Sequence, residues 1–356
     1  MISVNNRNKA HEDIDRIFRE LLPAHGMKER EGQISLSHTM LEAMLDGSIS
    51  LCDAGTGIGK TYSYLVAGVM FEKLRAESGE AFQPVLISTA SIALQNAVLN
   101  EYIPFLSGIL LEAGMIDKPI EAVVRKGKQH YVCDERLARR LNRVNLEKKN
   151  EKDAAALLSL QRHLDTANAE HLSNYDKRQV CVPLLCECHR TSCRYSQFIE
   201  EVQSDRYLFQ ICNHNLLIAD AIQRNGRLSV ILPDHAALII DEAHKLPEAA
   251  RQMFGRTLSC ADILSLIEGL RTERFILAAQ NLLEAAKPLV QQMNDEAKEA
   301  HGIGKEKYAL LKGMEKTLLS IKRAIATEVT PPLRSELSRM IDTLSLFTDR
   351  RNGVIR

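Results

Sequence analysis

A glycine-rich turn lies between an apolar run that begins at Ser48 and a helix-forming segment. The turn consists of Ala54, Gly55, Thr56, Gly57, Ile58, Gly59, Lys60 and Thr61. Glycines allow backbone N–H groups to surround a phosphate, and the positive end of the following helix adds to the attraction. In such a loop Lys60 would reach the β- and γ-phosphates of a nucleotide, and the Thr61 hydroxyl would help to hold Mg²⁺. The pattern predicts a buried strand, a phosphate loop and a helix. Ala54 stands where the strict pattern has glycine, so the alternative is a glycine-rich turn in an unrelated α/β domain.

An acidic pair follows the most hydrophobic run of the chain, Ala236–Ile240. Asp241 is expected to hold Mg²⁺, usually through its water shell, and Glu242 to polarise the water that attacks the γ-phosphate. His244 can then hydrogen-bond across the site. Because an apolar strand would carry both carboxylates to a sheet edge beside the phosphate loop, the two motifs together predict one site for ATP and Mg²⁺.

A distant cysteine and a dense later group have the chemistry of a metal site. These residues are Cys133, Cys181, Cys186, Cys188 and Cys193. Four thiolates, or three with His130 or His189, would hold structural zinc, and four thiolates would also hold an iron–sulfur cluster. The spacing alone does not choose between them. Cys52, Cys212 and Cys260 lie in apolar contexts, so we expect buried structural thiols there.

The bulk composition is that of a globular protein. The chain has 356 residues, with 46 Lys and Arg balanced by 46 Asp and Glu, so any argument for nucleic acid must come from local patches. No secretory signal and no run of membrane-spanning length is visible, so we expect a cytoplasmic protein with no membrane contact. In that compartment cysteines are thiols or metal ligands.

Periodicity predicts a doubly wound, parallel α/β sheet followed by an all-helical module. The expected strands are the run from Ser48, then 84–89, 121–125, 207–212 and 236–240. The expected helices are 9–22, a stretch through Met40 and Met44, 61–75, 90–102, 134–176, 261–270, 275–293, 305–326 and 333–346. The stretch 134–176 is basic at its start, which indicates either a solvated helix face or a DNA contact. The residues concerned are Arg136, Arg139, Arg140, Arg143, Lys148 and Lys149.

The order of these motifs resembles the amino-terminal part of a superfamily 2 DNA helicase of the DinG/XPD type. Matching features run from about Arg30 to Leu246: Gln33, placed where a glutamine can read an adenine edge, the loop 54–61, Ser88–Ala90 with Ala93–Gln95, Cys133, the later cysteines, Asn213–Leu217 and Asp241–His244. The resemblance implies a P-loop NTPase with a RecA-like lobe, an ATP-dependent 5′-to-3′ DNA helicase, and a 4Fe-4S cluster between the two ATP motifs. It thereby favours iron over zinc.

The resemblance also implies the cluster ligands. They would be Cys133, Cys181, Cys186 and Cys193, with Cys188 as the alternative to Cys181. Similar proteins often have Gly-Arg before the first cysteine, whereas this chain has Gly127-Lys128, which puts a bidentate phosphate contact there in doubt. Three aromatic residues could stack on single-stranded bases or pack the small cluster domain: Tyr131, Tyr195 and Phe198.

The expected domains are residues 1–120 for the first part of the RecA-like lobe, 121–205 for the iron–sulfur insertion, 206–246 for the rest of the lobe, and 247–356 for a helical, arch-like module. We expect no second RecA-like lobe and no arginine finger, so this chain alone should bind ATP and single-stranded DNA but hydrolyse ATP slowly and unwind nothing. A second polypeptide could then supply the missing lobe. The alternatives are a non-catalytic ATP- and DNA-binding regulatory module, half of a split helicase, and an RNA helicase, against which the cysteines argue. Repair or replication is the expected role.

Overall fold

The computed structural model describes residues 3–55, 57–144, 151–183, 186, 192–225, 230–295, 303–325 and 328–349. The chain forms two compact units, Met1–Met253 and Phe254–Arg356, which are described separately.

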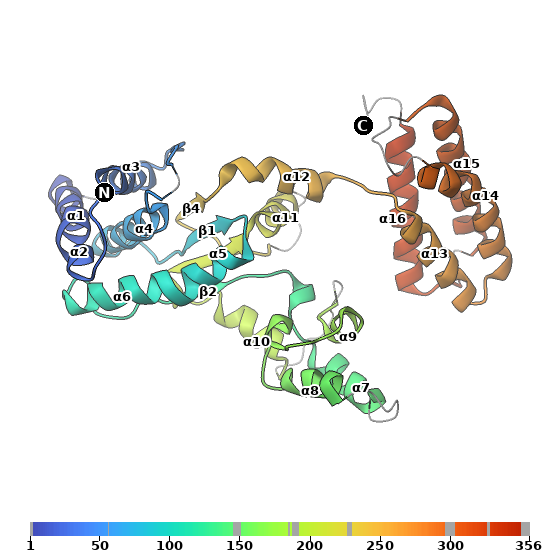
Figure 1. The fold of residues 1–356 in the computed structure, drawn as a ribbon, viewed down its shortest axis with the longest axis horizontal. Coiled ribbons are helices and arrows are strands. Elements are labelled where there is room, and N and C mark those ends of the chain that lie inside the picture. The colour runs from blue at the N-terminus through green and yellow to red at the C-terminus, as the bar shows by residue number, and fades with distance from the viewer. Residues whose placement is uncertain are drawn as a thin grey trace. The chain divides into compact units, whose positions relative to one another are not determined.

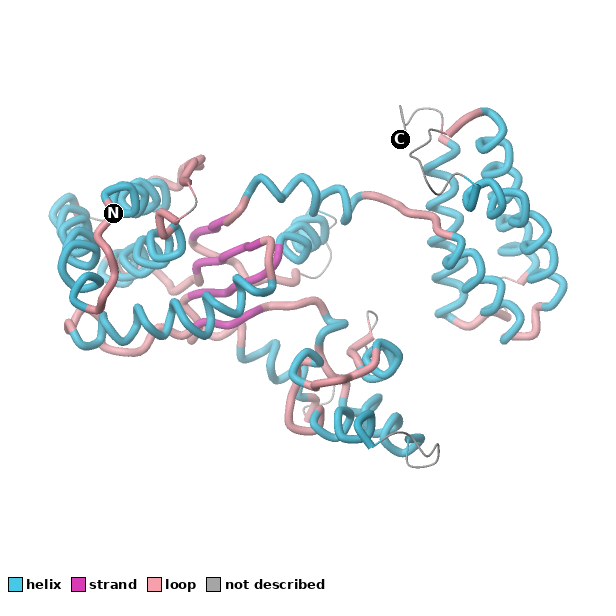
Figure 2. Tube along the Cα trace, viewed as in Figure 1, coloured by secondary structure: helices cyan, strands magenta, loops and turns pink. Residues whose placement is uncertain are grey.

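The first unit is built on a four-stranded parallel sheet (Figures 1 and 2). Its strands are β1 (Val85–Thr89), β2 (Ala122–Val124), β3 (Phe209–Asn213) and β4 (Ala237–Ile240), in the order β2-β3-β1-β4. Ser88 of β1 is level with Cys212 of β3 and with Ile240 of β4. The three strands therefore end at the same edge, where their polar successors meet. The predicted α/β class and four of the five predicted strands are confirmed.

Besides a 3₁₀ turn at Ala243–Lys245, ten helical segments of the described chain precede or follow these strands outside the cysteine-bearing region (Lys128–Glu201). They are α1 (Val4–Arg16), a π-helical turn (Ile17–Leu21), α2 (Leu22–Ala24), α3 (Glu31–Leu45), α4 (Lys60–Glu77), α5 (Ile92–Ala97), a second π-helical turn (Val98–Tyr102), α6 (Ile103–Glu112), α11 (His214–Asn225) and α12 (Leu246–Phe254). Helices α1, α3 and α4 pack together (Figure 1). The close approach of α4 to the sheet requires Gly68, because a Cβ there would lie 2.8 Å from the ring of Phe209.

The strand predicted before the phosphate loop is absent. Residues 48–53 form neither a strand nor a helix, and the side chains of Ile49 and Leu51 are 94% and 93% exposed. A strand exists only through hydrogen bonds to a neighbour, and none of the described residues pairs with this run. Cys52 is consequently exposed, so the expectation that it is buried was wrong.

The cysteine-bearing region is a set of short helices, and the single long helical stretch predicted for 134–176 was wrong. It contains α7 (Asp134–Val144), α8 (Glu151–Ser159), α9 (Asn174–Val180) and α10 (Arg194–Glu201), with 3₁₀ turns at Lys128–His130 and Thr166–Asn168. The side chains of Asp165 and Ser173 accept hydrogen bonds from backbone N–H groups two and three residues ahead, so each starts a new helical segment. A small core of Val132, Leu137, Leu157, Leu160, Ala169 and Val180 holds the region together.

The second unit is helical, as predicted. Its helices are α13 (Cys260–Thr272), α14 (Ile276–Asp295), α15 (Lys305–Ala324) and α16 (Pro331–Thr348), and buried residues of all four form one core (Figure 1). Ser259 and Asp262 form a capping box at the start of α13. No described helix of the chain is long and apolar enough to cross a membrane.

Candidate nucleotide site

The phosphate loop depends on glycine at two positions. Gly57 and Gly59 have φ angles of +84° and +92°, in the left-handed region that favours glycine. A Cβ at Gly59 would also lie 2.5 Å from Nε2 of Gln33. Gly59 directly precedes α4, so Lys60 and Thr61 occupy the first turn of that helix. The loop backbone and the helix start thus have the form expected for a phosphate site. Thr56 lies outside the described residues.

The lysine of the loop meets the acidic end of β4. Nζ of Lys60 lies 3.3 Å from Oε1 of Glu242, although 182 residues separate them in the sequence. Both side chains are about one-third exposed. Lys60 is also close enough to Asp241 to lower its pKa. The two motifs therefore lie at one place, as a shared nucleotide requires.

The two carboxylates differ in their electrostatic surroundings. Burial raises the pKa of Asp241, and Lys60 only partly opposes that shift. The hydrogen bond from Lys60 lowers the pKa of Glu242. Neighbouring carboxyl groups with pKa values moved in opposite directions are a feature of catalytic sites. Glu242 also has a φ of +55°, and strain of this kind in a non-glycine residue is concentrated at functional sites.

A buried histidine joins the ends of the neighbouring strands. His214 starts α11 directly after β3, and its Nδ1 lies 2.7 Å from Oγ of Ser88 at the end of β1. The backbone N–H of Asp241 in turn donates to the carbonyl of Ser88 at 2.9 Å. Burial lowers the pKa of His214, so its ring is neutral at pH 7. The sequence pattern placed Ser88 and His214 at strand ends but not in contact.

His244 lies at the rim of the site. Its side chain is 69% exposed, and Nε2 is 3.5 Å from Oε2 of Glu242. The ring can therefore approach a bound nucleotide from the solvent side.

Helix α3 supports the loop from the other side. Nε2 of Gln33 donates to the carbonyl of Gly59 at 2.8 Å, and Arg30 donates to the carbonyl of Gly57. The carbonyl of Gln33 accepts from Oγ of Ser63 on α4 at 2.9 Å. Gln33 is 3% exposed, and in this structure its amide N–H is used by the loop rather than offered to a base.

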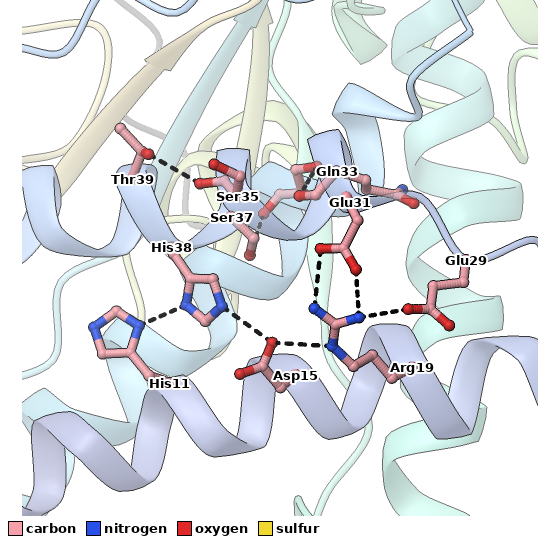
Figure 3. Close-up of polar contacts among 11 residues, drawn as sticks. His11, Asp15, Arg19, Glu29, Glu31, Gln33, Ser35, Ser37, His38 and Thr39 are labelled. Atoms are coloured by element: carbon pink, nitrogen blue, oxygen red, sulfur yellow. Dashed lines mark hydrogen bonds and ion pairs between the residues drawn. The ribbon is translucent and has the colours of Figure 1, made fainter.

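A polar network fixes α3 against α1 and the turn that follows it (Figure 3). Nδ1 of His11 lies 2.6 Å from Nδ1 of His38, whose Nε2 lies 3.3 Å from Asp15. Arg19 is paired at 2.5 Å with both Glu29 and Glu31. These contacts hold the helix that carries Gln33. The residues that make these contacts are far apart in the sequence and form no recognisable motif, so sequence reasoning missed them.

The candidate cluster cysteines lie at the ends of short helices. Cys133 precedes α7, Cys181 follows α9 and Cys193 precedes α10, and with Cys186 all four are partly buried thiols. Burial raises the pKa of Cys133, and Cys186 and Cys193 are near enough to raise it further. Val132, next to Cys133, pairs with Cys181 through the backbone. Cys188 and His189 lie outside the described residues.

The thiols converge without forming a ready metal site. Among the residues that the structure describes, no three His, Cys, Asp or Glu side chains are grouped closely enough to hold a metal ion. The donor chemistry and the convergence of three helix ends thus fit a group held by thiolates. Cys212 is buried, as predicted, and Cys260 is only partly so.

The three aromatic residues of this region pack on one another. Tyr131 is buried, and its ring centroid lies 5.4 Å from that of Tyr195 and 5.1 Å from that of Phe198. Its hydroxyl accepts from the backbone N–H of Lys126 at 3.0 Å. This arrangement matches the packing role, one of the two that the sequence left open.

Comparison with known proteins gives consistent relatives. No protein-family model matches the chain. The chain is 27% identical over 283 residues to the ATP-dependent DNA helicase YoaA of Escherichia coli (strain K12), which covers 76% of this chain and 42% of that protein. It is 26% identical over 290 residues to the 3'-5' exonuclease DinG of Bacillus subtilis (strain 168). That match covers 78% of this chain and 28% of the Bacillus protein. The ATP-dependent DNA helicase DinG of Photobacterium profundum is 27% identical over 285 residues. That match covers 75% of this chain and 38% of the Photobacterium protein.

These relatives agree with the family that the motifs indicated. The resemblance to DinG-type helicases is confirmed. The chain spans less than half the length of each of the three relatives.

Proposed function

We propose that this chain, which resembles the DinG-type helicases, is part of an ATP-dependent DNA helicase and binds ATP, Mg²⁺ and single-stranded DNA. The observation that carries the proposal is the meeting of Lys60 and Glu242 at 3.3 Å across 182 residues. Two relatives are named ATP-dependent DNA helicases, which supports the same assignment.

In the proposed reaction the ion pair between Lys60 and Glu242 is exchanged for contacts with the substrate. The loop 54–61 surrounds the phosphates with backbone N–H groups, and Lys60 turns from Glu242 to the β- and γ-phosphates. The freed carboxylate of Glu242 then orients a water molecule and accepts its proton as the water attacks the γ-phosphate, and the bond to the β-phosphate oxygen breaks so that ADP leaves. In the free protein the hydrogen bond from Lys60 lowers the pKa of Glu242, so the carboxyl group is ionised before the exchange takes place.

Asp241 and Thr61 are the groups that would hold Mg²⁺, which supplies positive charge to the phosphates when bound. Burial makes an unpaired carboxylate at Asp241 unfavourable, so a cation beside it relieves a cost that the free protein carries. We assign His244 to linking the nucleotide to moving parts, because it lies beside Glu242 at the solvent rim.

The proposal includes a 4Fe-4S cluster held by Cys133, Cys181, Cys186 and Cys193, with Cys188 as the alternative ligand. The convergence of thiols at three helix ends supports it, and four thiolates on one cluster would cross-link those ends. Anaerobically purified protein should be brown and contain iron, whereas colourless protein with bound zinc would contradict this part of the proposal.

Nucleotide affinity tests the ATP site. Lys60→Ala should weaken binding of a fluorescent ATP analogue about 10- to 100-fold, because it removes a charge-assisted contact to phosphate. Lys73→Ala is the matched control, since Lys73 is on the same helix but pairs with Asp13 at 3.0 Å. Equal affinities for both variants would contradict the proposed site.

ATPase activity and the preference for DNA or RNA distinguish the remaining candidate functions. ATPase activity that increases with single-stranded DNA supports the helicase, whereas intact ATP binding without hydrolysis indicates a non-catalytic module or half of a split enzyme. Competition between DNA and RNA oligonucleotides of one sequence then tests the nucleic acid, with preference for RNA counting against the proposal.

A further inference from the structure

A cavity of about 150 Å³ lies in the cysteine-bearing region, away from the nucleotide site. Its lining residues are Arg136, Arg139 and Arg140 of α7 and Gln179 of α9. Three arginines and one glutamine thus line the same space. Such a lining is strongly donor-rich, because each guanidinium has five N–H groups and no acceptor.

Two of the arginines are held in place by the protein. Nη1 and Nη2 of Arg136 donate to the carbonyls of Cys181 and Arg178, both at 2.9 Å. Arg140 is buried, and its Nε donates at 2.7 Å to Asp176, which Ser173 also contacts. The cavity wall is therefore ordered before any ligand arrives, which lowers the entropy cost of binding.

Among the residues that the structure describes, the three arginines at the cavity wall lie beside two carboxylates, those of Glu135 and Asp176. Among the described residues, Arg136 is paired only with carbonyl oxygens, which leave its charge in place. Arg139 has a single carboxylate neighbour, Glu135 at 3.7 Å, and its side chain is 66% exposed. Asp176 is the other carboxylate at the wall, and it faces Arg140. An anion would complete the charge balance.

The size and the donor geometry indicate the class of anion. Planar arginine forks match phosphate oxygens bidentately. The volume is well below the roughly 300–1,000 Å³ of pockets that enclose whole small molecules. The space therefore suits a single phosphate group. The rest of the ligand that carries this phosphate would extend into solvent past Arg139.

We propose that Arg136, Arg139, Arg140 and Gln179 form a phosphate-binding subsite between α7 and α9. The phosphate would come from the backbone of a nucleic acid strand or from a free phosphate compound. The first source rests on the function proposed above. Arg136 also donates to the carbonyl of Cys181. A nucleic acid strand bound here would therefore contact a side chain that holds the backbone of a candidate cluster ligand.

The test measures binding of a fluorescent oligothymidylate to the full chain at several salt concentrations. Arg139→Gln should weaken binding about tenfold and reduce the salt slope by about 0.7, the value for one phosphate contact on a single strand. Arg139→Lys should keep the slope but still weaken binding, since the fork is lost. Arg162→Gln is the control, because Arg162 is an exposed arginine of the same region outside the cavity.

A second arm tests free phosphate. Pyrophosphate is added to Lys60→Ala protein, which removes the contribution of the phosphate loop, and the thermal midpoint is compared with that of the Lys60→Ala, Arg139→Gln double variant. A larger stabilisation of the single variant supports the subsite.

The outcomes separate this inference from the proposed function. If the oligonucleotide binds, Arg139→Gln behaves like Arg162→Gln and pyrophosphate gives no stabilisation that depends on Arg139, the subsite is overturned and the helicase proposal stands. If no oligonucleotide binds but pyrophosphate stabilises through Arg139, the subsite takes free phosphate and the DNA-binding proposal fails. If neither ligand is bound, both are overturned.

Discussion

The candidate nucleotide site and the cysteine-bearing region of the first unit are positioned in different ways. At the nucleotide site, three parallel strands end level with one another, and Ser88, His214 and Asp241 are joined by hydrogen bonds at that edge. In the other region, short helices surround a core of six buried residues, and the thiols approach one another without reaching metal-ligand spacing among the described residues.

The difference concerns what the bound group must contribute. A sheet edge places groups from distant parts of the sequence before any ligand binds, because backbone hydrogen bonds set the strand register. Short helices with a small core would leave a larger share of the ordering energy to any ligand that binds there. Four substitutions test this contrast.

Gly59→Ala should have the largest effect. It forces a Cβ into the amide of Gln33 at a φ of +92°, so we expect nucleotide affinity to fall at least tenfold, with about 1–3 kcal/mol of lost stability. Isothermal calorimetry and urea unfolding measure the two quantities. The control is Gly47→Ala, which has a φ of +60° but no neighbour within 4 Å of the added Cβ. It should lose stability only, and equal losses of affinity in both would show that the Gln33 contact is unimportant.

Cys133→Ser should remove the brown colour and most of the iron of anaerobically purified protein, because a cubane cluster needs its thiolates. The same change should lower the thermal midpoint of the protein and leave the affinity for ATP unchanged. Cys212→Ser is the control, since Cys212 is buried in β3 and is not a candidate ligand. Loss of ATP affinity in Cys133→Ser would show that the two regions do not behave independently.

Asp241→Asn should stabilise the free protein by about 1 kcal/mol at pH 7 while abolishing hydrolysis. Because the folded pKa of Asp241 is raised, the folded state binds its proton more tightly than the unfolded state does. The native carboxyl therefore favours folding most at low pH and loses that advantage as the pH rises through the raised pKa. In urea unfolding, the stabilisation of the folded state by Asp241→Asn should be smaller at pH 4 than at pH 7. A stabilisation independent of pH would contradict this explanation.

Glu242→Gln should have the smallest effect on stability, a loss of about 0–1 kcal/mol at pH 7, because the pair with Lys60 is partly exposed. The folded pKa of Glu242 is lowered, so its contribution is present above the unfolded pKa and disappears as the pH falls through the folded value. ATP affinity should be kept or increased, since Lys60 is freed, whereas hydrolysis should fall. A weaker affinity for ATP would contradict the proposed exchange of the ion pair.

Local patterns were sufficient for most of the elements. Helical periodicity predicted α13 to α16 within a few residues, and apolar runs predicted β1, β3 and β4. Each of these segments buries a face that its own residues define. The glycine-rich turn with positive φ at Gly57 and Gly59, directly before α4, likewise follows from residue type and spacing, because such a turn is a local structure.

Contacts between distant segments could not be predicted in this way. The run 48–53 has the composition of a strand but no described partner, since pairing is a property of two segments. Three features join residues that share no motif. They are the contact of His11 with His38, the hydrogen bond from Gln33 to Gly59, and the arginine-lined cavity between α7 and α9. Residue types and short spacings thus predicted candidate chemistry, whereas the packing of the folded chain determined which groups meet, because side-chain distances across the molecule depend on every intervening element.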